Sequence, residues 1–214
     1  MELNKYIDHT NLNAFSTEED IKKLCDEAIK YKFAAVCVNP YYVSYASEYL
    51  KHENINVACV VGFPLGMNKM ITKEYEAIAA IEDGADEIDM VINIGALKDK
   101  NYDYIKEEIE NIRDAIDGKT LKVIIETCYL TEEEIIKMTE ICNETFVNFI
   151  KTSTGFGTRG ASMDDISIIN KHKNEILEVK ASGGIKDYET ASSFIEAGVS
   201  RIGTSHGANI MKEE

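Results

Sequence analysis

The chain has 214 residues, of which 44% are hydrophobic and 29% are charged. These values are ordinary for one globular domain with a sizeable core, and they exclude a disordered or collagen-like chain. Lys and Arg number 23, whereas Asp and Glu number 38, so the formal net charge is −15. Because so acidic a body repels nucleic-acid phosphates and anionic membrane surfaces, we expect no nucleic-acid partner and no membrane partner.

The first residues and the cysteines bear on where the protein works. The start at Met1–Tyr6 is polar and lacks the apolar segment of a secretory signal. No apolar run approaches the roughly 20 residues of a membrane helix. The five cysteines are widely spaced, and no two have C-x-x-C spacing. We therefore expect neither a disulfide framework nor a zinc site, and we predict a cytoplasmic protein.

Helical patterns alternate with short apolar runs along the chain. Helices are expected from a capping box at Ser16–Glu19, from Pro40, over Met70–Asp83, around Ile105–Ile116, from a capping box at Thr131–Glu134, from Ser162 or Asp164, over Asp187–Gly198, and from Ser205. Strands are expected at Tyr6–His9, Ala34–Asn39, Val57–Val61, Glu87–Asn93, Leu121–Glu126, Val147–Lys151, Glu178–Ala181 and Arg201–Gly203.

Eight strands, each followed by a helix or a helix-sized loop, predict an α/β fold of the (β/α)8 TIM-barrel type. We expect one compact domain over residues 1–214, with the segment 1–15 contributing to the barrel. A doubly wound open sheet is the alternative. In the fourth predicted strand, Ile88, Met90 and Ile92 form an apolar face opposite Glu87 and Asp89. A sheet covered by helices on both sides would be apolar on both faces, so the mixed face favours the barrel.

Two lysines stand near the ends of neighbouring predicted strands, where parallel barrels hold their active sites. Lys151 and Lys180 each lie in a short apolar run, and a glycine-bearing loop follows each. They could simply reach the rim and carry charge. Alternatively, two ammonium groups held together force one to lose its proton, and the resulting amine can form a Schiff base with a carbonyl. Asp89 would then share a proton relay with Lys180, or else form an ion pair for structure alone.

Glycines follow the seventh and eighth predicted strands. Gly183 and Gly184 follow one, and Gly203, Thr204 and Ser205 lead from the other into the last helix. Barrels commonly hold phosphate on the backbone N–H groups of these two loops. Ordinary turns are the alternative, and we favour a phosphate site.

Two cofactor classes are disfavoured. The segment Gly155–Gly160 matches G-x-G-x-x-G, but its helix is expected to begin only near Ser162, and Glu178 precedes the core of its strand. The four histidines are not paired at metal-ligand spacing, and an interior with two lysines disfavours a cation. We therefore expect no cofactor and no metal. Cys37 has no histidine placed to activate its thiol, and we expect a small inward-facing residue beside the substrate.

Eight segments resemble deoxyribose-phosphate aldolases, in the same order and over nearly the whole chain. They are Ile7–Thr10, Val36–Pro40, Val61–Gly66, Gly84–Val91, Lys122–Thr127, Phe149–Phe156, Val179–Ile185 and Arg201–Ser205. The resemblance implies a metal-free, Schiff-base aldolase on a (β/α)8 barrel. It implies reversible cleavage of 2-deoxy-D-ribose 5-phosphate to acetaldehyde and D-glyceraldehyde 3-phosphate, in deoxyribonucleoside catabolism. The partners would be small phosphosugars and aldehydes, and a homo-oligomer, as a dimer or tetramer, stays open.

The resemblance also assigns roles to residues. Lys151 would form the Schiff base, and Lys180 and Asp89 would be the proton-relay pair. Asp8 and Thr10 would help to place a water near them. Phosphate would bind the backbone around Gly155, Gly183, Gly184, Gly203, Thr204 and Ser205. The alternatives are another Schiff-base phosphosugar aldolase, a transaldolase-like barrel, and a phosphosugar-binding barrel without turnover.

The chain departs from the family pattern in three places. Phe156 stands where some relatives carry a phosphate-contacting lysine, and His206 follows Ser205 where a small residue is common. The chain also ends at Glu214, without the longer tail that some members use to close on substrate. We expect these departures to weaken phosphate binding more than the chemistry.

Overall fold

The strands close into a parallel barrel in the computed structural model, which describes residues 2–213. Each strand is parallel to the next, and the last pairs with the first. The strands are β1 (Ile7–Asn11), β2 (Ala35–Val38), β3 (Asn56–Val61), β4 (Glu87–Val91), β5 (Thr120–Ile124), β6 (Phe149–Lys151), β7 (Glu178–Ser182) and β8 (Arg201–Thr204). The closed order confirms the predicted (β/α)8 fold and excludes the doubly wound sheet.

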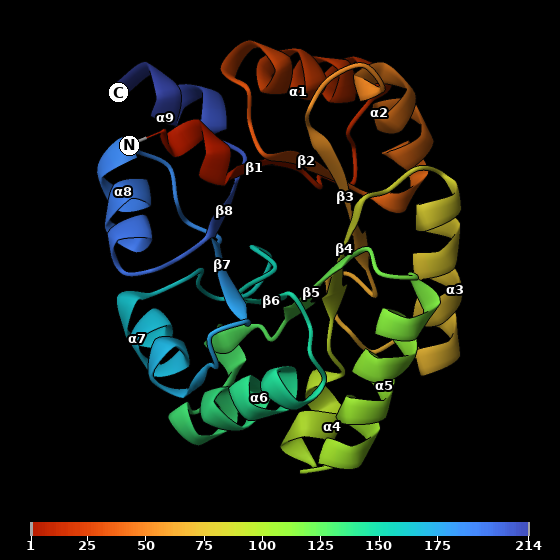
Figure 1. The fold of residues 1–214 in the computed structure, drawn as a ribbon, viewed down its shortest axis with the longest axis vertical. Helices are drawn as coiled ribbons and strands as arrows, with labels where there is room; N and C mark the ends of the chain where they lie inside the picture. The colour runs from red at the N-terminus through yellow and green to blue at the C-terminus, as the bar shows by residue number, and fades with distance from the viewer. Residues whose placement is uncertain (1, 214) are drawn as a thin grey trace.

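Helices surround the barrel (Figure 1). They are α1 (Glu18–Tyr31), α2 (Val43–Leu50), α3 (Met70–Glu82), α4 (Ile94–Lys98), α5 (Tyr102–Ala115), α6 (Glu132–Glu144), α7 (Met163–His172), α8 (Tyr188–Glu196) and α9 (Gly207–Glu213). Short 3-10 turns occur at η1 (Leu3–Tyr6), η2 (Pro40–Tyr42) and η3 (Thr127–Tyr129). The short α4 was not predicted, because five residues show no helical period. No helix in residues 2–213 has both the length and the apolar character that a membrane crossing requires.

The first predicted capping box is wrong by one residue. Thr17 caps α1, and its partner is Asp20, whose carboxylate accepts a hydrogen bond from the Thr17 N–H at 2.8 Å. Ser16 does not cap the helix, because its hydroxyl donates to Asn11 Oδ1 at 2.8 Å. The second predicted box, at the start of α6, is present as expected. Both boxes satisfy N–H groups that the first helical turn would leave unbonded.

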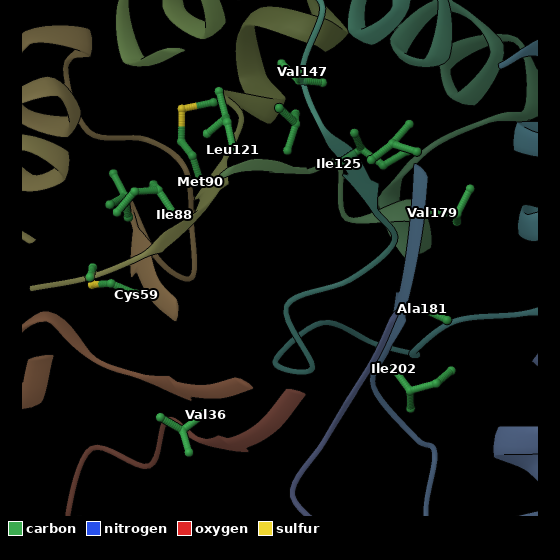
Figure 2. Close-up of a cluster of buried hydrophobic side chains, with 14 of the residues drawn as sticks. Val36, Cys59, Ile88, Met90, Leu121, Ile125, Val147, Val179, Ala181 and Ile202 are labelled. Atoms are coloured by element: carbon green, nitrogen blue, oxygen red, sulfur yellow. The ribbon is translucent and has the colours of Figure 1, made fainter. Parts of the chain in front are cut away.

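Two hydrophobic clusters lie on the two sides of the barrel wall. The larger one fills the space between the strands and the helices, and Figure 2 shows its labelled side chains pointing from the strands toward the surrounding helices. It includes Ile88, Met90 and Ile92, the face of β4 that was predicted to be apolar. The smaller cluster lies inside the barrel and includes Cys37 and Ala58. The predicted division between an outer apolar face and an inner mixed face is therefore confirmed.

The strand register stacks the inward-facing side chains in layers drawn from alternate strands. The layer nearest the amino ends of the strands contains Ala35, Glu87, Phe149 and Arg201. The middle layer contains Asp8, Ala58, Lys122 and Lys180, and the layer toward the carboxyl ends contains Cys37, Asp89, Lys151 and Gly203. Branched apolar residues usually fill such layers. Here charged groups fill much of the interior, so its stability depends on how they pair.

Candidate active site

Seven charged side chains meet inside the barrel. They are Asp8, Glu87, Asp89, Lys122, Lys151, Lys180 and Arg201, and we call them the charged column. Six of these side chains are at most 3% exposed, and the Arg201 side chain is 17% exposed. Buried charges are costly unless each has a partner, so the pairs decide which groups keep their charge.

Asp89 lies at the centre of the charged column. Its Oδ2 accepts hydrogen bonds from Lys151 Nζ at 2.8 Å and from Lys180 Nζ at 2.7 Å. Its Oδ1 accepts from Lys122 Nζ at 2.7 Å. Burial alone would raise the pKa of this carboxyl, but the three lysines outweigh burial and hold the pKa well below its usual value. Asp89 is therefore a carboxylate at neutral pH, and it joins the two lysines singled out in the sequence.

Lys151 is the last residue of β6, and of the three lysines in the charged column it alone lines the cavity at the barrel mouth. Its one carboxylate partner among the described residues is Asp89. Burial lowers the pKa of the Lys151 amine, Asp89 opposes this effect, and Lys180 lowers the pKa further. The pKa thus moves in the direction expected from the sequence. The largest cause, however, is burial rather than the neighbouring lysine.

Lys180 and Asp8 hold their charges. Lys180 Nζ lies 2.5 Å from Asp8 Oδ2 and 2.7 Å from Asp89 Oδ2. Burial opposes the charge, but the two carboxylates raise the pKa of Lys180 above its ordinary value. Burial also opposes the charge of Asp8, whose pKa is nevertheless lowered to about 2, chiefly by Lys180, Lys122 and Arg201. Of the two predicted lysines, Lys151 is therefore the one that more readily becomes a neutral amine.

A cavity of about 350 Å³ opens at the carboxyl ends of the strands, above Lys151. The residues predicted to bind phosphate all line it: Gly155, Gly183, Gly184, Gly203, Thr204 and Ser205. Three of these glycines, at 155, 183 and 184, have positive φ values that suit glycine. Their N–H groups donate no backbone hydrogen bond within residues 2–213. Unbonded amide donors at the rim can bind an anion, while the amine below can reach a carbonyl carbon.

The other predicted residues lie at or beneath this cavity. Thr10 lines it, and its hydroxyl donates to the backbone oxygen of Asp8 at 2.8 Å. Asp8, Asp89 and Lys180 are fully buried below it. Cys37 faces inward as predicted, and burial raises the pKa of its thiol, so the thiol keeps its proton. Of these charged groups, Lys151 thus borders the cavity, whereas Asp8, Asp89 and Lys180 lie behind it.

Several residues at the site were missed in the sequence. Lys122 bonds Asp89 and also contacts Glu87, while Arg201 contacts Asp8 and Glu87. The sequence feature that indicates both residues is a charge at an inward-facing position of a predicted strand. Lys186 also lines the cavity, and its signal was its place two residues after the glycine pair.

Glu126 holds the loop that follows β6. It is buried, its backbone is left-handed with φ 52°, and its carboxylate accepts hydrogen bonds from the Thr154 N–H at 3.3 Å and from the Thr154 hydroxyl. A Cβ added at Gly157 would lie 2.5 Å from Cys128 Sγ and 3.1 Å from this carboxylate, so the close approach needs glycine. Glu126 therefore fixes the segment that carries Gly155 and Phe156 to the cavity rim. Its position at the end of a predicted strand was the available signal.

Two of the three departures from the family pattern, Phe156 and His206, face the cavity. Phe156 lines it and packs edge-to-face against Phe63, with ring centroids 5.3 Å apart. His206 also lines it, and its Nδ1 lies 3.1 Å from Ser205 Oγ. The wall at position 156 is thus aromatic where a cation would bind phosphate, and Lys186 supplies a cation elsewhere on the lining.

The G-x-G-x-x-G segment has the context expected from the sequence. The helix after it, α7, begins at Met163 and is capped by Ser162, beyond the glycines. Glu178 is exposed at the start of β7, at the end of the barrel opposite the cavity. In residues 2–213, no group of three or more His, Cys, Asp or Glu side chains is arranged to hold a metal ion.

Known proteins match this chain over nearly its whole length. A family model described as DeoC/LacD family aldolase matches residues 3–213. The deoxyribose-phosphate aldolase of Thermococcus gammatolerans is 56% identical over 99% of this chain and 96% of that protein. A solved structure described as "QR15, an Aldolase" is 45% identical with a TM-score of 0.95, over 99% of this chain and 95% of that one.

A second solved structure is more distant. It is described as a unique tetrameric structure of deoxyribose phosphate aldolase from Aeropyrum pernix. It is 28% identical with a TM-score of 0.91, over 98% of this chain and 89% of that one. With the family model, these full-length matches leave one conclusion: the chain belongs to the DeoC/LacD family of aldolases.

Proposed function

We propose that this protein is a deoxyribose-phosphate aldolase, which reversibly cleaves 2-deoxy-D-ribose 5-phosphate to acetaldehyde and D-glyceraldehyde 3-phosphate. One observation carries the proposal: the Lys151 amine, with its lowered pKa, opens onto a cavity rimmed by unbonded backbone N–H groups. The amine suits a carbonyl carbon, and the rim suits a phosphate. The relative from Thermococcus gammatolerans, named for this reaction, supports the choice of substrate. Such a lyase would act in deoxyribonucleoside catabolism.

In the proposed mechanism, the neutral amine of Lys151 attacks the C1 aldehyde of the open-chain sugar. The carbinolamine hydroxyl then takes up a proton and leaves as water, which gives an iminium ion in which C1 is bonded to Nζ. The iminium carries a positive charge, and the carboxylate of Asp89, 2.8 Å from Nζ in the free enzyme, stabilises that charge. The iminium then acts as the electron sink for the next step.

Cleavage begins when the C3 hydroxyl loses its proton. We assign this transfer to Asp89 and Lys180, through a water placed by Asp8 and Thr10. As the C2–C3 bond breaks, its electron pair moves toward the iminium and forms an enamine, while C3 becomes the aldehyde of glyceraldehyde 3-phosphate. A proton then returns to C2, and hydrolysis of the new iminium frees acetaldehyde and the amine. Lys180 suits the relay because it contacts both carboxylates.

The phosphate is proposed to bind at the cavity rim. Its ligands would be the backbone around Gly155, Gly183, Gly184, Gly203, Thr204 and Ser205, together with the Lys186 cation, all on the lining of one cavity. Phe156 offers no charge, so the binding energy must come from these groups. Cys37, small and inward-facing, would lie beside the donor carbons.

Borohydride trapping tests this function. Incubation with acetaldehyde and borohydride should leave a two-carbon adduct on Lys151, which mass spectrometry of a protease digest can locate. Lys151→Ala should abolish both the adduct and the cleavage of deoxyribose 5-phosphate. A wild-type protein that forms no adduct would instead be a phosphosugar-binding barrel, and the proposal would fail.

A second measurement separates related aldolases. Another Schiff-base phosphosugar aldolase, or a transaldolase-like barrel, would trap a different carbonyl donor and release no acetaldehyde from deoxyribose 5-phosphate. If the phosphate is anchored at the rim, unphosphorylated deoxyribose should be cleaved far more slowly, whereas equal rates would remove the anchor from the proposal.

We also infer that residues 1–214 work as one domain in a reducing cytoplasm, as a homo-oligomer. The five cysteines are free in the structure, which suits a reducing compartment. Strand β1, at Ile7–Asn11, supports a contribution of the segment 1–15 to the barrel. The relative from Aeropyrum pernix is described as tetrameric, which supports a dimer or a tetramer here. Light scattering during size-exclusion chromatography would determine the state, and a monomer would contradict the inference.

A further inference from the structure

The charged column is balanced in charge only when Lys151 is neutral. Its carboxylates are Asp8, Glu87 and Asp89, and its other cations are Lys122, Lys180 and Arg201. These groups give three negative and three positive charges. A protonated Lys151 would add an uncompensated charge to a buried set of ion pairs, where such a charge is costly.

Arg201 lies at the end of the charged column remote from the cavity. As the first residue of β8, it stands at the amino end of the barrel, and it does not line the cavity. Its guanidinium lies 2.5 Å from Asp8 Oδ1 and 3.2 Å from Glu87 Oε1, and it stacks over the ring of Phe149 at 5.8 Å. It therefore pairs with two of the three buried carboxylates.

A continuous run of ion pairs joins Arg201 to the amine. Asp8 pairs with Arg201 on one side and with Lys180, at 2.5 Å, on the other. Lys180 pairs in turn with Asp89 at 2.7 Å, and Asp89 contacts Lys151 at 2.8 Å. A second branch runs from Arg201 through Glu87 to Lys122 and again to Asp89. Both branches end on the one carboxylate that Lys151 contacts. A change of charge at the far end is thus felt at Asp89 through buried groups, which salt screens little.

We propose that Arg201 and Glu87, at the amino end of the barrel, are positioning residues that fix the charge of the Lys151 amine through this column of ion pairs. The inference rests on the proposed function, because it concerns the reactive form of the proposed nucleophile. Neither residue lines the cavity in which the substrate would bind. Each acts by keeping the buried positive and negative charges equal in number, so that the amine at the mouth stays unprotonated.

The proposal predicts opposite effects for the two residues. Loss of the Arg201 charge leaves a net negative interior, which favours proton uptake by Lys151. Loss of the Glu87 charge leaves a net positive interior, which favours proton release. The groups that face Lys151 are Asp89 from β4, Lys180 from β7 and the thiol of Cys37 from β2. None of these three changes in either variant, so the sign of the shift follows from the far end alone.

The experiment measures the pH dependence of cleavage and of adduct formation with acetaldehyde. Both rates should rise with pH as the Lys151 amine loses its proton. Arg201→Met should move this rise to higher pH by about one unit, which lowers the rate at neutral pH by up to about tenfold. Glu87→Gln should move the rise to lower pH. The double variant should return it to the wild-type position. Arg201→Lys keeps the charge and should stay closer to wild type than Arg201→Met.

Matched controls separate this effect from a structural one. Arg113 lies on α5 and pairs with Asp114 at the surface, so Arg113→Met removes the same formal charge without touching the charged column. It should leave the pH profile unchanged. Should Arg201→Met fail to fold, Glu87→Gln and the double variant still test the sign.

The outcomes are distinct. A uniform fall in rate with no shift along the pH axis, or shifts of the same sign in both single variants, overturns the proposal. If the wild-type enzyme forms no adduct at all, the proposed function fails first, and the two failures can be told apart.

Discussion

Lys151 and Lys180 show how the surroundings of a residue set its chemistry. Both are buried, both lie on neighbouring strands, and both donate to the same oxygen of Asp89. Lys180 has a second carboxylate partner, Asp8, and its pKa is raised. Lys151 has no second carboxylate partner within residues 2–213, and its pKa is lowered. One additional ion pair therefore separates a lysine that is protonated at rest from a potential nucleophile.

This difference predicts the behaviour of Lys180→Met. Cleavage should slow by roughly 100-fold or more, because a proton-transfer group is lost. The pKa of Lys151 should rise, since a positive neighbour is removed and Asp89 is left with fewer partners. Steady-state rates and the pH dependence of borohydride trapping measure the two effects. Lys171→Met, at an exposed position on α7, should change neither. Wild-type turnover in Lys180→Met would contradict the relay.

At the scale of elements, a second buried ion pair secures the end of β4. Lys73 on α3 and Glu108 on α5 are fully buried and 2.7 Å apart. Lys73 also donates to the backbone oxygen of Val91 at 2.7 Å, and Glu108 accepts from the N–H of Asn93 at 3.1 Å. The pair thus binds two helices to the segment just beyond the strand that carries Asp89.

Removing one partner of this pair should destabilise the fold. Lys73→Met leaves the Glu108 carboxylate buried without its cation, which costs about 3 to 5 kcal/mol in comparable cases. Urea unfolding followed by circular dichroism measures the loss. The double variant Lys73→Met with Glu108→Leu removes both charges and should recover most of the stability. A single variant as stable as wild type would show that the pair is dispensable.

The elements also show which parts of the site the sequence could reveal. Lys151 and the phosphate-loop glycines could be predicted because they stand at or just beyond the carboxyl ends of strands, where barrel enzymes place their sites. Lys180 was found because it lies near the end of its predicted strand, although in the structure it lies in the middle of β7. Lys122 and Arg201 were not singled out, because the signal in each of their strands is limited to a charge on the inward face. Nothing in a single strand shows that a charge there is buried. That depends on β4, β5, β7, β8 and β1 closing around one axis, which pairs residues more than a hundred positions apart.

At the scale of the whole molecule, two sets of carboxylates respond differently to acid. The surface set gives the chain its net charge of −15, and these groups repel one another. Mild acidification reduces that repulsion and costs little. The buried set, in contrast, is held ionised by lysines and arginine, and the pKa values of Asp8 and Asp89 are lowered. Protonating these two groups breaks the charged column from within.

The sign of the stability change follows from this. A carboxyl with a folded-state pKa below its unfolded value contributes stability that is present above the unfolded pKa and lost as the pH falls through the folded one. For Asp8, the pKa falls from 3.8 to about 2, so this contribution, about 2 kcal/mol, should be complete above about pH 5 and mostly lost near pH 2. Asp89 acts in the same direction.

Urea midpoints measured from neutral pH to about pH 3 should therefore stay level at first and then fall steeply. Asp8→Asn should be less stable at neutral pH and should show a shallower fall, because one of the linked protons is gone. Asp99→Asn, at an exposed position after α4, removes the same formal charge and should keep the wild-type slope. An Asp8→Asn protein with the full acid dependence would mean that surface repulsion, rather than the charged column, governs acid unfolding.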